Sequence, residues 1–420
     1  MFFCRASIRR RARTVKLLLL AALLVIVVFV LIVWTLSSMA DSETSSSELD
    51  GQWSVSEPPV DPADGTQTMG SNDHENEHLP FDSLDVDYDV HVFYYPWYGN
   101  PEYDNGSYYH WNHRGRHRPP EDVGSSYYPT LGCYSSRDAR VLHQHMQWIR
   151  QSGIGVIVVS WYPPDRSDSE GRPWDALIPS IMQAAQRQGL KVTFLIEPYD
   201  GRNGRSLHND FKYIVERYGV HPSFYRYRFK EALKPLLYVY DSYLVADEEW
   251  RSVLRDGGNN SIRNTAFDCF VLGLLVKDRD KHKLVANGFD GCFTYFASSR
   301  FSYGSTPTNW RLIASFANRH GLIFSPSVGP GYVDETIRPW NQLCTRHRQN
   351  GDYYKKIFNE WHEGTQIEPA APQYSESGKA NDENSPRYLD YLPMDPEYYL
   401  TLTRELIKNK KSQVTIYRCQ

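Results

Sequence analysis

The feature that most constrains this chain is a repeated alternation of strand-like and helix-like segments after residue 82. Seven short runs rich in β-branched and aromatic residues are interpreted as strands: 90–95, 155–161, 191–198, 235–241, 268–276, 289–296 and 322–327. The amphipathic stretches between them are predicted helices: 136–152, 175–189, 209–219, 247–255 and 307–321. This pattern is typical of parallel strands joined by crossover helices. No glycine-rich phosphate loop follows the first strand, which disfavours a dinucleotide-binding fold. We therefore predict an α/β fold, a (β/α)8 TIM-type barrel, for residues 83–420.

The amino-terminal region carries a second strong signal. Residues 17–36 read LLLLAALLVIVVFVLIVWTL without a charge, and about 20 apolar residues are what a helix needs to cross a bilayer. Residues 1–16 contain a cluster of basic side chains: Arg5, Arg9, Arg10, Arg11, Arg13 and Lys16. The positive-inside bias then predicts a cytoplasmic tail (1–16), a transmembrane signal-anchor (17–36) in the lipid bilayer, and a lumenal remainder. A cleaved signal peptide is the alternative, because small residues follow at 37–40.

Residues 37–82 are predicted to be a disordered lumenal stem. They are rich in Ser, Glu, Asp, Pro and Gly and have almost no periodic apolar residues, so they cannot bury enough surface to fold. Two N-x-S sequons lie beyond the stem, at Asn105 and Asn259. Both are usable only in a lumenal domain.

Composition excludes several classes of function. The net charge of −4 creates no field that would gather nucleic acid. Six cysteines occur without a C-x-x-C pair, which argues against a zinc site and a disulfide-stapled scaffold. We predict no metal and no cofactor. The 30 Tyr and 11 Trp residues favour a surface that stacks on the flat faces of sugars, in addition to a core.

The ends of the predicted strands are unusually polar and aromatic. In a barrel the working residues come from the C-terminal strand ends and the loops after them. Six of the seven strands end in this way, at 94–98, 160–164, 197–199, 240–243, 294–296 and, after the last strand, 329–332. Although any single ring could pack on a neighbouring loop instead, the shared pattern predicts an aromatic cleft suited to a pyranose.

The segment FNEWHEGTQIE at 358–368 concentrates acidic residues near the end of the pattern. Glycoside cleavage needs two carboxyl groups with different roles, and Glu360 and Glu363 are the candidates. A zinc-protease motif is rejected because Gln366 stands where the second histidine would be. The alternative for a Glu-x-x-Glu spacing is a solvated helix face.

At these residues the sequence resembles glycoside hydrolase family 99, the glycoprotein endo-α-1,2-mannosidases. Motifs that carry the resemblance include HVFYYPWYGNP, GRHRPPEDVGSSYYP, VVSWYPPD, YVYDSY, GFDGCFTYFAS, PSVGPGYVDETIRPWN and FNEWHEGTQIE, all in one order. The resemblance implies a retaining, metal-independent, endo-acting enzyme of the Golgi membrane that removes a glucosylated mannose unit from high-mannose N-glycans on glycoproteins. It also implies that the substrate's own 2-hydroxyl attacks C1 to give a 1,2-anhydro sugar. Glu360 would take the 2-hydroxyl proton, and Glu363 would act as acid and then as base.

Matching the motifs residue by residue also yields substrate-binding candidates, to which the strand-end pattern adds Trp97. The full set is Tyr94, Trp97, Tyr162, Glu197, Tyr240, Arg338 and His362. His362 and Tyr240 are the neighbours expected to separate the pKa values of the two glutamates.

The sequence departs from the family pattern in three places. Leu195 stands where relatives carry a histidine, and the loop after HWNH at 110–113 is short. More seriously, only Lys355, Lys356 and Ile357 separate Tyr354 from Phe358, so the eighth strand is predicted to be truncated. Two alternative functions remain open. One is a catalytically impaired, mannoside-binding isoform, and the other is a Golgi glycosyltransferase using a D-x-D motif at 278–280 or 85–87.

Overall fold

The computed structural model describes residues 85–170, 172–353, 359–372 and 388–413, all within one compact unit, Glu77–Gln420. The predicted tail, transmembrane span and stem lie outside the described residues. Within the described part, no helix is long and apolar enough to cross a membrane.

The core is an eight-stranded sheet in the order β1-β2-β3-β5-β6-β7-β8, with β4 paired to β5 outside this path. The strands are β1 (Asp87–Tyr94), β2 (Ile154–Trp161), β3 (Lys191–Ile196), β4 (Arg226–Phe229), β5 (Ala232–Val239), β6 (Phe270–Leu274), β7 (Gly291–Phe293) and β8 (Ile323–Ser325). Every pairing along the path is parallel, and only β4 runs antiparallel to its neighbour. The prediction of a parallel α/β fold is thereby confirmed.

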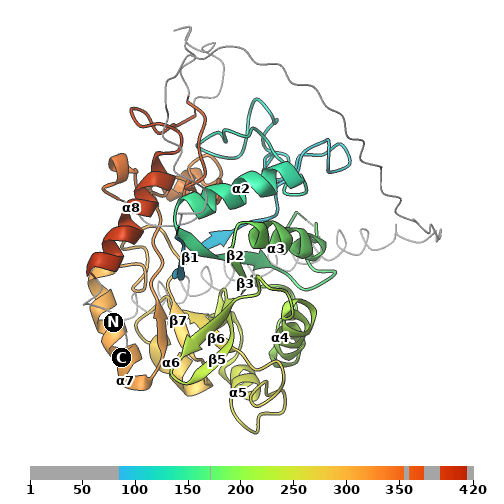
Figure 1. Ribbon diagram of the computed structural model, residues 1–420, viewed down its shortest axis with the longest axis vertical. Coiled ribbons are helices and arrows are strands. Elements are labelled where there is room, and N and C mark those ends of the chain that lie inside the picture. The colour runs from blue at the N-terminus through green and yellow to red at the C-terminus, as the bar shows by residue number, and fades with distance from the viewer. Residues whose placement is uncertain (1–84, 171, 354–358, 373–387, 414–420) are drawn as a thin grey trace, which may run out of the picture. The chain divides into compact units, whose positions relative to one another are not determined.

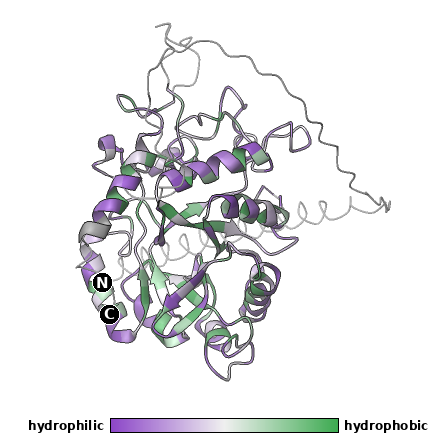
Figure 2. Cartoon of the chain, in the orientation of Figure 1, coloured by the Kyte–Doolittle hydropathy of each residue, from purple (hydrophilic) through white to green (hydrophobic). Residues whose placement is uncertain are grey.

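The helices cover the outer side of the strands (Figure 1). They are α2 (Ala139–Gln151), α3 (Ile178–Arg187), α4 (Gly204–Tyr218), α5 (Asp247–Leu254), α6 (Asp280–Asn287), α7 (Trp310–His320) and α8 (Tyr398–Gln413). Short 3-10 turns precede α3 (Asp175–Leu177) and α7 (Pro307–Asn309), and others occupy Ser242–Leu244, Pro339–Cys344 and Gln349–Gly351. Figure 2 shows hydrophobic strands and helices that combine hydrophobic with hydrophilic positions, as expected when each helix buries one face.

The sheet curves until distant strands meet across its inner face. The Phe93 ring on β1 lies 6.0 Å from that of Tyr238 on β5 and 6.1 Å from that of Phe293 on β7. The Tyr238 hydroxyl also hydrogen-bonds His91 Nδ1 at 2.8 Å. Strands far apart along the path share an interior layer, as in a TIM-like barrel filled by side chains.

The two ends of the sheet path are β1 and β8. Among the described residues, β1 pairs along the path only with β2, and β8 only with β7. The prediction of a truncated eighth strand falls partly on residues 354–358, which lie outside the described residues. The chain is described again from Asn359 onward, beside the end of β1.

Several elements differ from the sequence-based expectation. The strand β4 and the helices α6 and α8 were not predicted, and β7 and β8 are shorter than their apolar runs. Helix α4 begins at Gly204 rather than at 209, because Asn203 and Ser206 form a reciprocal capping box. Such a cap satisfies backbone N–H groups that the first turn would otherwise leave without partners.

Candidate active site

The two predicted catalytic carboxyls lie in a segment that we call the carboxylate loop, residues 359–368. Glu360 is 4 % exposed, and its Oε1 accepts a hydrogen bond from the backbone N–H of His362 at 3.1 Å. The Glu363 side chain is 21 % exposed, and its Oε1 accepts from Arg338 Nη1 at 3.1 Å. Glu360 is therefore deep and, among the described residues, has no cation in hydrogen-bond contact, whereas Glu363 is nearer the surface and ion-paired.

Their environments separate the two acids. Burial, and then the charge of Glu363, raise the pKa of Glu360 well above its ordinary range. Burial also raises the pKa of Glu363, but the Arg338 guanidinium opposes that rise through its charge and its hydrogen bond. The Arg338 guanidinium therefore favours the ionised form of Glu363, and Glu360 lacks such an ion pair among the described residues. Two neighbouring carboxyls with unequal proton affinities are what acid–base chemistry on one substrate requires.

His362 is a neutral hydrogen-bonding residue in this site. Burial lowers its pKa well below the ordinary value, and its Nε2 lies 2.7 Å from the backbone carbonyl of His110. Since a carbonyl only accepts, Nε2 carries the proton and Nδ1 remains an acceptor. His110 adopts a φ of 62°, a left-handed conformation that is uncommon for a non-glycine residue.

The tyrosine that reaches the carboxylates from β1 is Tyr95 rather than the predicted Tyr94. The Tyr95 hydroxyl hydrogen-bonds that of Tyr295, and its pKa is raised by burial and by the charges of Glu360 and Glu197. The Tyr94 hydroxyl instead lies 3.0 Å from Nδ1 of His145 on α2. Because successive side chains point to opposite faces of a strand, a shift of one residue moves the hydroxyl away from the site.

Tyr240 and Glu197 follow β5 and β3 directly, at the C-terminal edge of the sheet. Burial and the charge of Glu363 raise the pKa of Tyr240 well above its ordinary value, so its hydroxyl stays protonated. Glu197 accepts a hydrogen bond from Ser160 Oγ at 2.8 Å, and burial raises its pKa to about 8. Both side chains thus present protons to the site at neutral pH.

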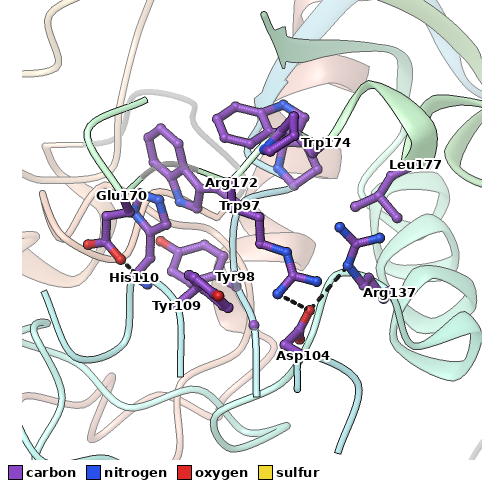
Figure 3. A pocket seen from close by; sticks show the side chains of 13 residues that line it. Trp97, Tyr98, Asp104, Tyr109, His110, Arg137, Glu170, Arg172, Trp174 and Leu177 are labelled. Atoms are coloured by element: carbon purple, nitrogen blue, oxygen red, sulfur yellow. Dashed lines mark hydrogen bonds and ion pairs between the residues drawn. The ribbon is translucent and has the colours of Figure 1, made fainter. Parts of the chain in front are cut away.

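The predicted aromatic residues Trp97 and Tyr162 follow β1 and β2. The Trp97 ring stacks between Tyr95 and His110, with centroid distances of 4.5 Å to each, and Tyr162 contacts Trp174 edge to face at 5.2 Å. Figure 3 shows the pocket behind Trp97, where Asp104 lies between Arg137 and Arg172. This pocket encloses about 10 Å³, room for about one water molecule, so it cannot hold a sugar.

The structure therefore brings most of the predicted site together. Contacts or mutual effects on pKa connect Glu360, Glu363, Arg338, His362, Glu197, Tyr240 and Trp97, and Tyr162 lies at the edge through Trp174. Sequence reasoning missed Tyr295 and His110 as site residues. Both lie within the motifs GFDGCFTYFAS and HWNH, so the signal was present but did not distinguish which side chain points inward.

Asn359 attaches the start of the carboxylate loop to the end of β1. The Tyr95 backbone N–H donates to Asn359 Oδ1 at 2.8 Å, and Asn359 Nδ2 donates to the Tyr95 carbonyl at 3.0 Å. This is the donor and acceptor pair that the backbone of a neighbouring strand would provide. Within the described ranges, the side-chain amide makes the backbone contact that a neighbouring strand would make at this edge.

Glu368, the last residue of the carboxylate loop, stabilises the loop by binding Trp361 within it. Its carboxylate accepts from Tyr134 Oη at 2.8 Å and from Trp361 Nε1 at 3.0 Å, and it lies 3.1 Å from His145 Nε2. Trp361 stands between Glu360 and His362, so this fully buried network holds the backbone that carries both.

No metal site emerges from the described part of the chain, where no group of three or more His, Cys, Asp or Glu side chains converges. The D-x-D segment at 278–280 is engaged locally. Asp280 accepts from the backbone N–H groups of Val276 and Lys277, and Asp278 pairs with Lys281. These contacts explain Asp278 and Asp280 as local structural residues and give no support for a nucleotide-sugar site at 278–280.

Comparison with known proteins agrees with this geometry. The model of glycosyl hydrolase family 99 matches residues 85–412. A glycoprotein endo-α-1,2-mannosidase from Rattus norvegicus is 42 % identical over 401 residues, covering 88 % of this chain and 82 % of the relative. The Xenopus laevis protein of the same name is 47 % identical over 350 residues, covering 76 % of each chain. The solved GH99 endo-α-mannosidase of Bacteroides thetaiotaomicron is 35 % identical with a TM-score of 0.69, covering 79 % of this chain and 99 % of the other. With paired carboxyls in a TIM-like sheet and a family match over nearly all of the described residues, this chain belongs to glycosyl hydrolase family 99 and is a glycosidase.

Proposed function

We propose that the chain is a retaining endo-α-1,2-mannosidase that removes a glucosylated mannose unit from high-mannose N-glycans. The name of these relatives, glycoprotein endo-α-1,2-mannosidase, supports the endo-α-1,2-mannosidase part of the proposal. The observation that carries the proposal is that Glu360 and Glu363 meet Arg338, His362 and Tyr240 despite the short link before Phe358. A retaining mechanism through a neighbouring hydroxyl needs one carboxyl to accept a proton and one to donate it.

In the proposed mechanism, Glu360 accepts the proton of the substrate 2-hydroxyl while O2 bonds to C1. The bond from C1 to the leaving oxygen breaks as Glu363 donates its proton to that oxygen. Water then attacks C1 of the 1,2-anhydro sugar. Glu363 takes the proton of this water, and Glu360 returns its proton to O2. Each carboxyl ends the cycle in its starting state.

This mechanism requires that Glu363 become protonated before it meets the glycosidic oxygen. Arg338 favours an ionised Glu363, whereas the acid that meets the glycoside must be protonated. We propose that the incoming sugar takes up the Arg338 guanidinium, which weakens its hold on Glu363 and lets the proton move from Glu360 to Glu363. The free enzyme and its complex then have different ionisation states.

We also propose that the enzyme is a single-pass type II protein of the Golgi membrane. The apolar run at 17–36, the basic residues before it and the low-complexity stem at 37–82 support this topology. Asn105 and Asn259 are both exposed, as acceptors for N-glycans must be. Protease protection in sealed vesicles checks the orientation, because only the tail at 1–16 should be digested from the cytoplasmic side.

A catalytically impaired mannoside-binding protein is the second candidate, favoured by the truncated eighth unit. Product analysis decides between them. The full-length protein in detergent is incubated with a glucosylated high-mannose glycan, beside Glu360→Gln and Glu363→Gln. We expect release of an intact glucosyl-mannose disaccharide, reduced at least about 100-fold in both variants. Mannoside binding without any release by the folded wild-type protein would select the binding-only alternative.

A further inference from the structure

Arg348 is a buried cation that the acid–base chemistry does not use. It lies between β8 and the carboxylate loop and is 6 % exposed. Within the part of the chain that the structure describes, no carboxylate lies within 4.0 Å of its guanidinium. A buried charge without a counterion is costly, so its surroundings must stabilise it in another way.

Three tyrosine rings enclose the guanidinium. Its central carbon lies 4.6 Å from the ring centroid of Tyr127 and 4.7 Å from those of Tyr391 and Tyr399. The electron-rich faces of aromatic rings attract a cation, most strongly where water is excluded. Among the described residues, Arg348 Nε and Nη1 face these tyrosines without a well-formed hydrogen bond, so the ring contacts contribute to the stabilisation of the charge.

The remaining nitrogen, Nη2, hydrogen-bonds the backbone of the carboxylate loop. Arg348 Nη2 donates to the backbone carbonyls of Gly364 at 3.0 Å and Gln366 at 2.7 Å. Gly364 directly follows Glu363 and has a φ of 59°, a turn that favours glycine. A Cβ at Gly364 would lie 2.9 Å from the Val333 carbonyl oxygen. The two hydrogen bonds from Arg348 thus stabilise a tight turn directly after Glu363.

The cage joins parts of the chain that are distant in sequence. Tyr127 precedes α2, Tyr399 belongs to α8, and the hydroxyl of Tyr391 donates to the Glu368 carbonyl at 2.8 Å. Only a planar guanidinium can stack against rings while its edge donates to two carbonyls. A lysine at this position would keep the charge and lose that geometry.

We propose that Arg348 is a positioning residue, which through its tyrosine cage and two carbonyl contacts sets the placement of Glu363 for proton transfer. The kinetic part of this inference rests on the proposed mannosidase activity. Its structural part concerns the carboxylate loop alone and does not need turnover.

The test compares full-length Arg348→Lys with Arg263→Lys. Arg263 is a control because its mostly buried guanidinium also donates to backbone carbonyls, those of Leu254, Cys269 and Gly288, and additionally pairs with Asp268 and Asp290. These partners are not among the residues of the carboxylate site. Misplacement of a catalytic group by about 1 Å costs up to about 100-fold in rate. We therefore expect kcat of Arg348→Lys to fall by about 10- to 100-fold with KM within about twofold, and kcat of Arg263→Lys to stay unchanged.

Hydrogen exchange of the peptide spanning 359–368 provides the readout that does not depend on activity. We expect its amides to exchange at least about tenfold faster in Arg348→Lys than in wild type and in Arg263→Lys. Unchanged exchange, or an unchanged kcat in an active enzyme, overturns the positioning role. An inactive wild type whose loop still loosens in Arg348→Lys refutes the proposed mannosidase activity and leaves the positioning role standing.

Discussion

Strands β2 and β5 are each eight residues long, whereas β7 and β8 have three residues each. We call strands β1, β2, β3, β5 and β6 the strand wall; parallel ladders of two to six residue pairs join them through backbone hydrogen bonds, which most side chains permit. The carboxylate loop beyond β8 is held by individual side chains, among them Asn359 and Glu368. The support of the site is thus insensitive to sequence on one side of the barrel and dependent on a few residues on the other.

Leu237→Ala should have the largest effect on stability and should leave catalysis intact. Leu237 is fully buried on β5, and truncating such a residue costs about 3 kcal/mol of unfolding free energy. Urea denaturation measures this loss. The kcat of the folded protein at low temperature should stay within about twofold of wild type. A large loss of kcat would show that the strand wall and the contacts of the carboxylate loop do not support the site independently.

Asn359→Ala should reduce stability less than Leu237→Ala does and reduce kcat more. It leaves the Tyr95 N–H and carbonyl without their side-chain partners, at a cost of about 2 kcal/mol. Because the loop start is then free, kcat should fall at least about tenfold. Asn359→Asp is the informative companion, since it can accept from the Tyr95 N–H but, when ionised, repels the carbonyl. Wild-type kcat in both variants would show that this seam does not position Glu360.

Glu197→Gln tests a buried acid on the strand-supported side through the pH dependence of stability. The pKa of Glu197 is about 8 in the folded protein and 4.5 ordinarily, so the folded state keeps a proton that the unfolded chain loses between these values. The stability that protonated Glu197 gives the folded state is fully present below pH 4.5. It is lost as the pH rises toward 8, at up to about 1.4 kcal/mol per pH unit.

Melting temperatures from pH 5 to pH 8 should therefore fall less steeply for Glu197→Gln than for wild type. Glu216→Gln, on an exposed part of α4, should follow the wild-type curve. Parallel curves for Glu197→Gln and wild type would contradict the buried, protonated state of Glu197.

Arg338→Gln should produce the smallest shift, visible in the pH–rate profile. Arg338 lowers the pKa of Glu363, so its removal raises that pKa, and the acid stays protonated to higher pH. The alkaline limb of kcat/KM, which reports the free enzyme, should move to higher pH. The limb of kcat should not move if the bound sugar already draws Arg338 away from Glu363. Equal movement of both limbs would refute that part of the mechanism.

Much of the fold was predictable because it depends on periodicity within short windows. The apolar runs that became β2, β3 and β5 are unambiguous, and the helices between them bury one face. Strand β4 was missed because it has only four residues, Arg226–Phe229, which is too short for its alternation of arginine and aromatic residues to stand out. Helix α8 was missed because its buried apolar residues, among them Tyr399, Leu400 and Ile407, follow a helical period only weakly in a segment rich in charged and polar residues.

The site was predictable at the level of motifs and less so at the level of single side chains. Glu360 and Glu363 stand out by chemistry, whereas the choice between Tyr94 and Tyr95 depends on the face of β1 that each residue occupies. Asn359 and Arg348 act through partners brought near by the fold. Asn359 meets Tyr95 across 264 positions in the sequence. No local pattern in the sequence specifies such contacts.

Because the Asn359 side chain joins the carboxylate loop to the end of β1, this contact tolerates different mutations from those that a paired strand tolerates. An ordinary strand accepts many substitutions but not the gain or loss of one residue, which turns every side chain to the wrong face. Among the described residues, the contact with the end of β1 is made by a single side chain, so a change in the number of residues before Asn359 need not break it. The barrel is consequently open to insertions and deletions at the point where its last strand would close it, and it is vulnerable there to a single codon change.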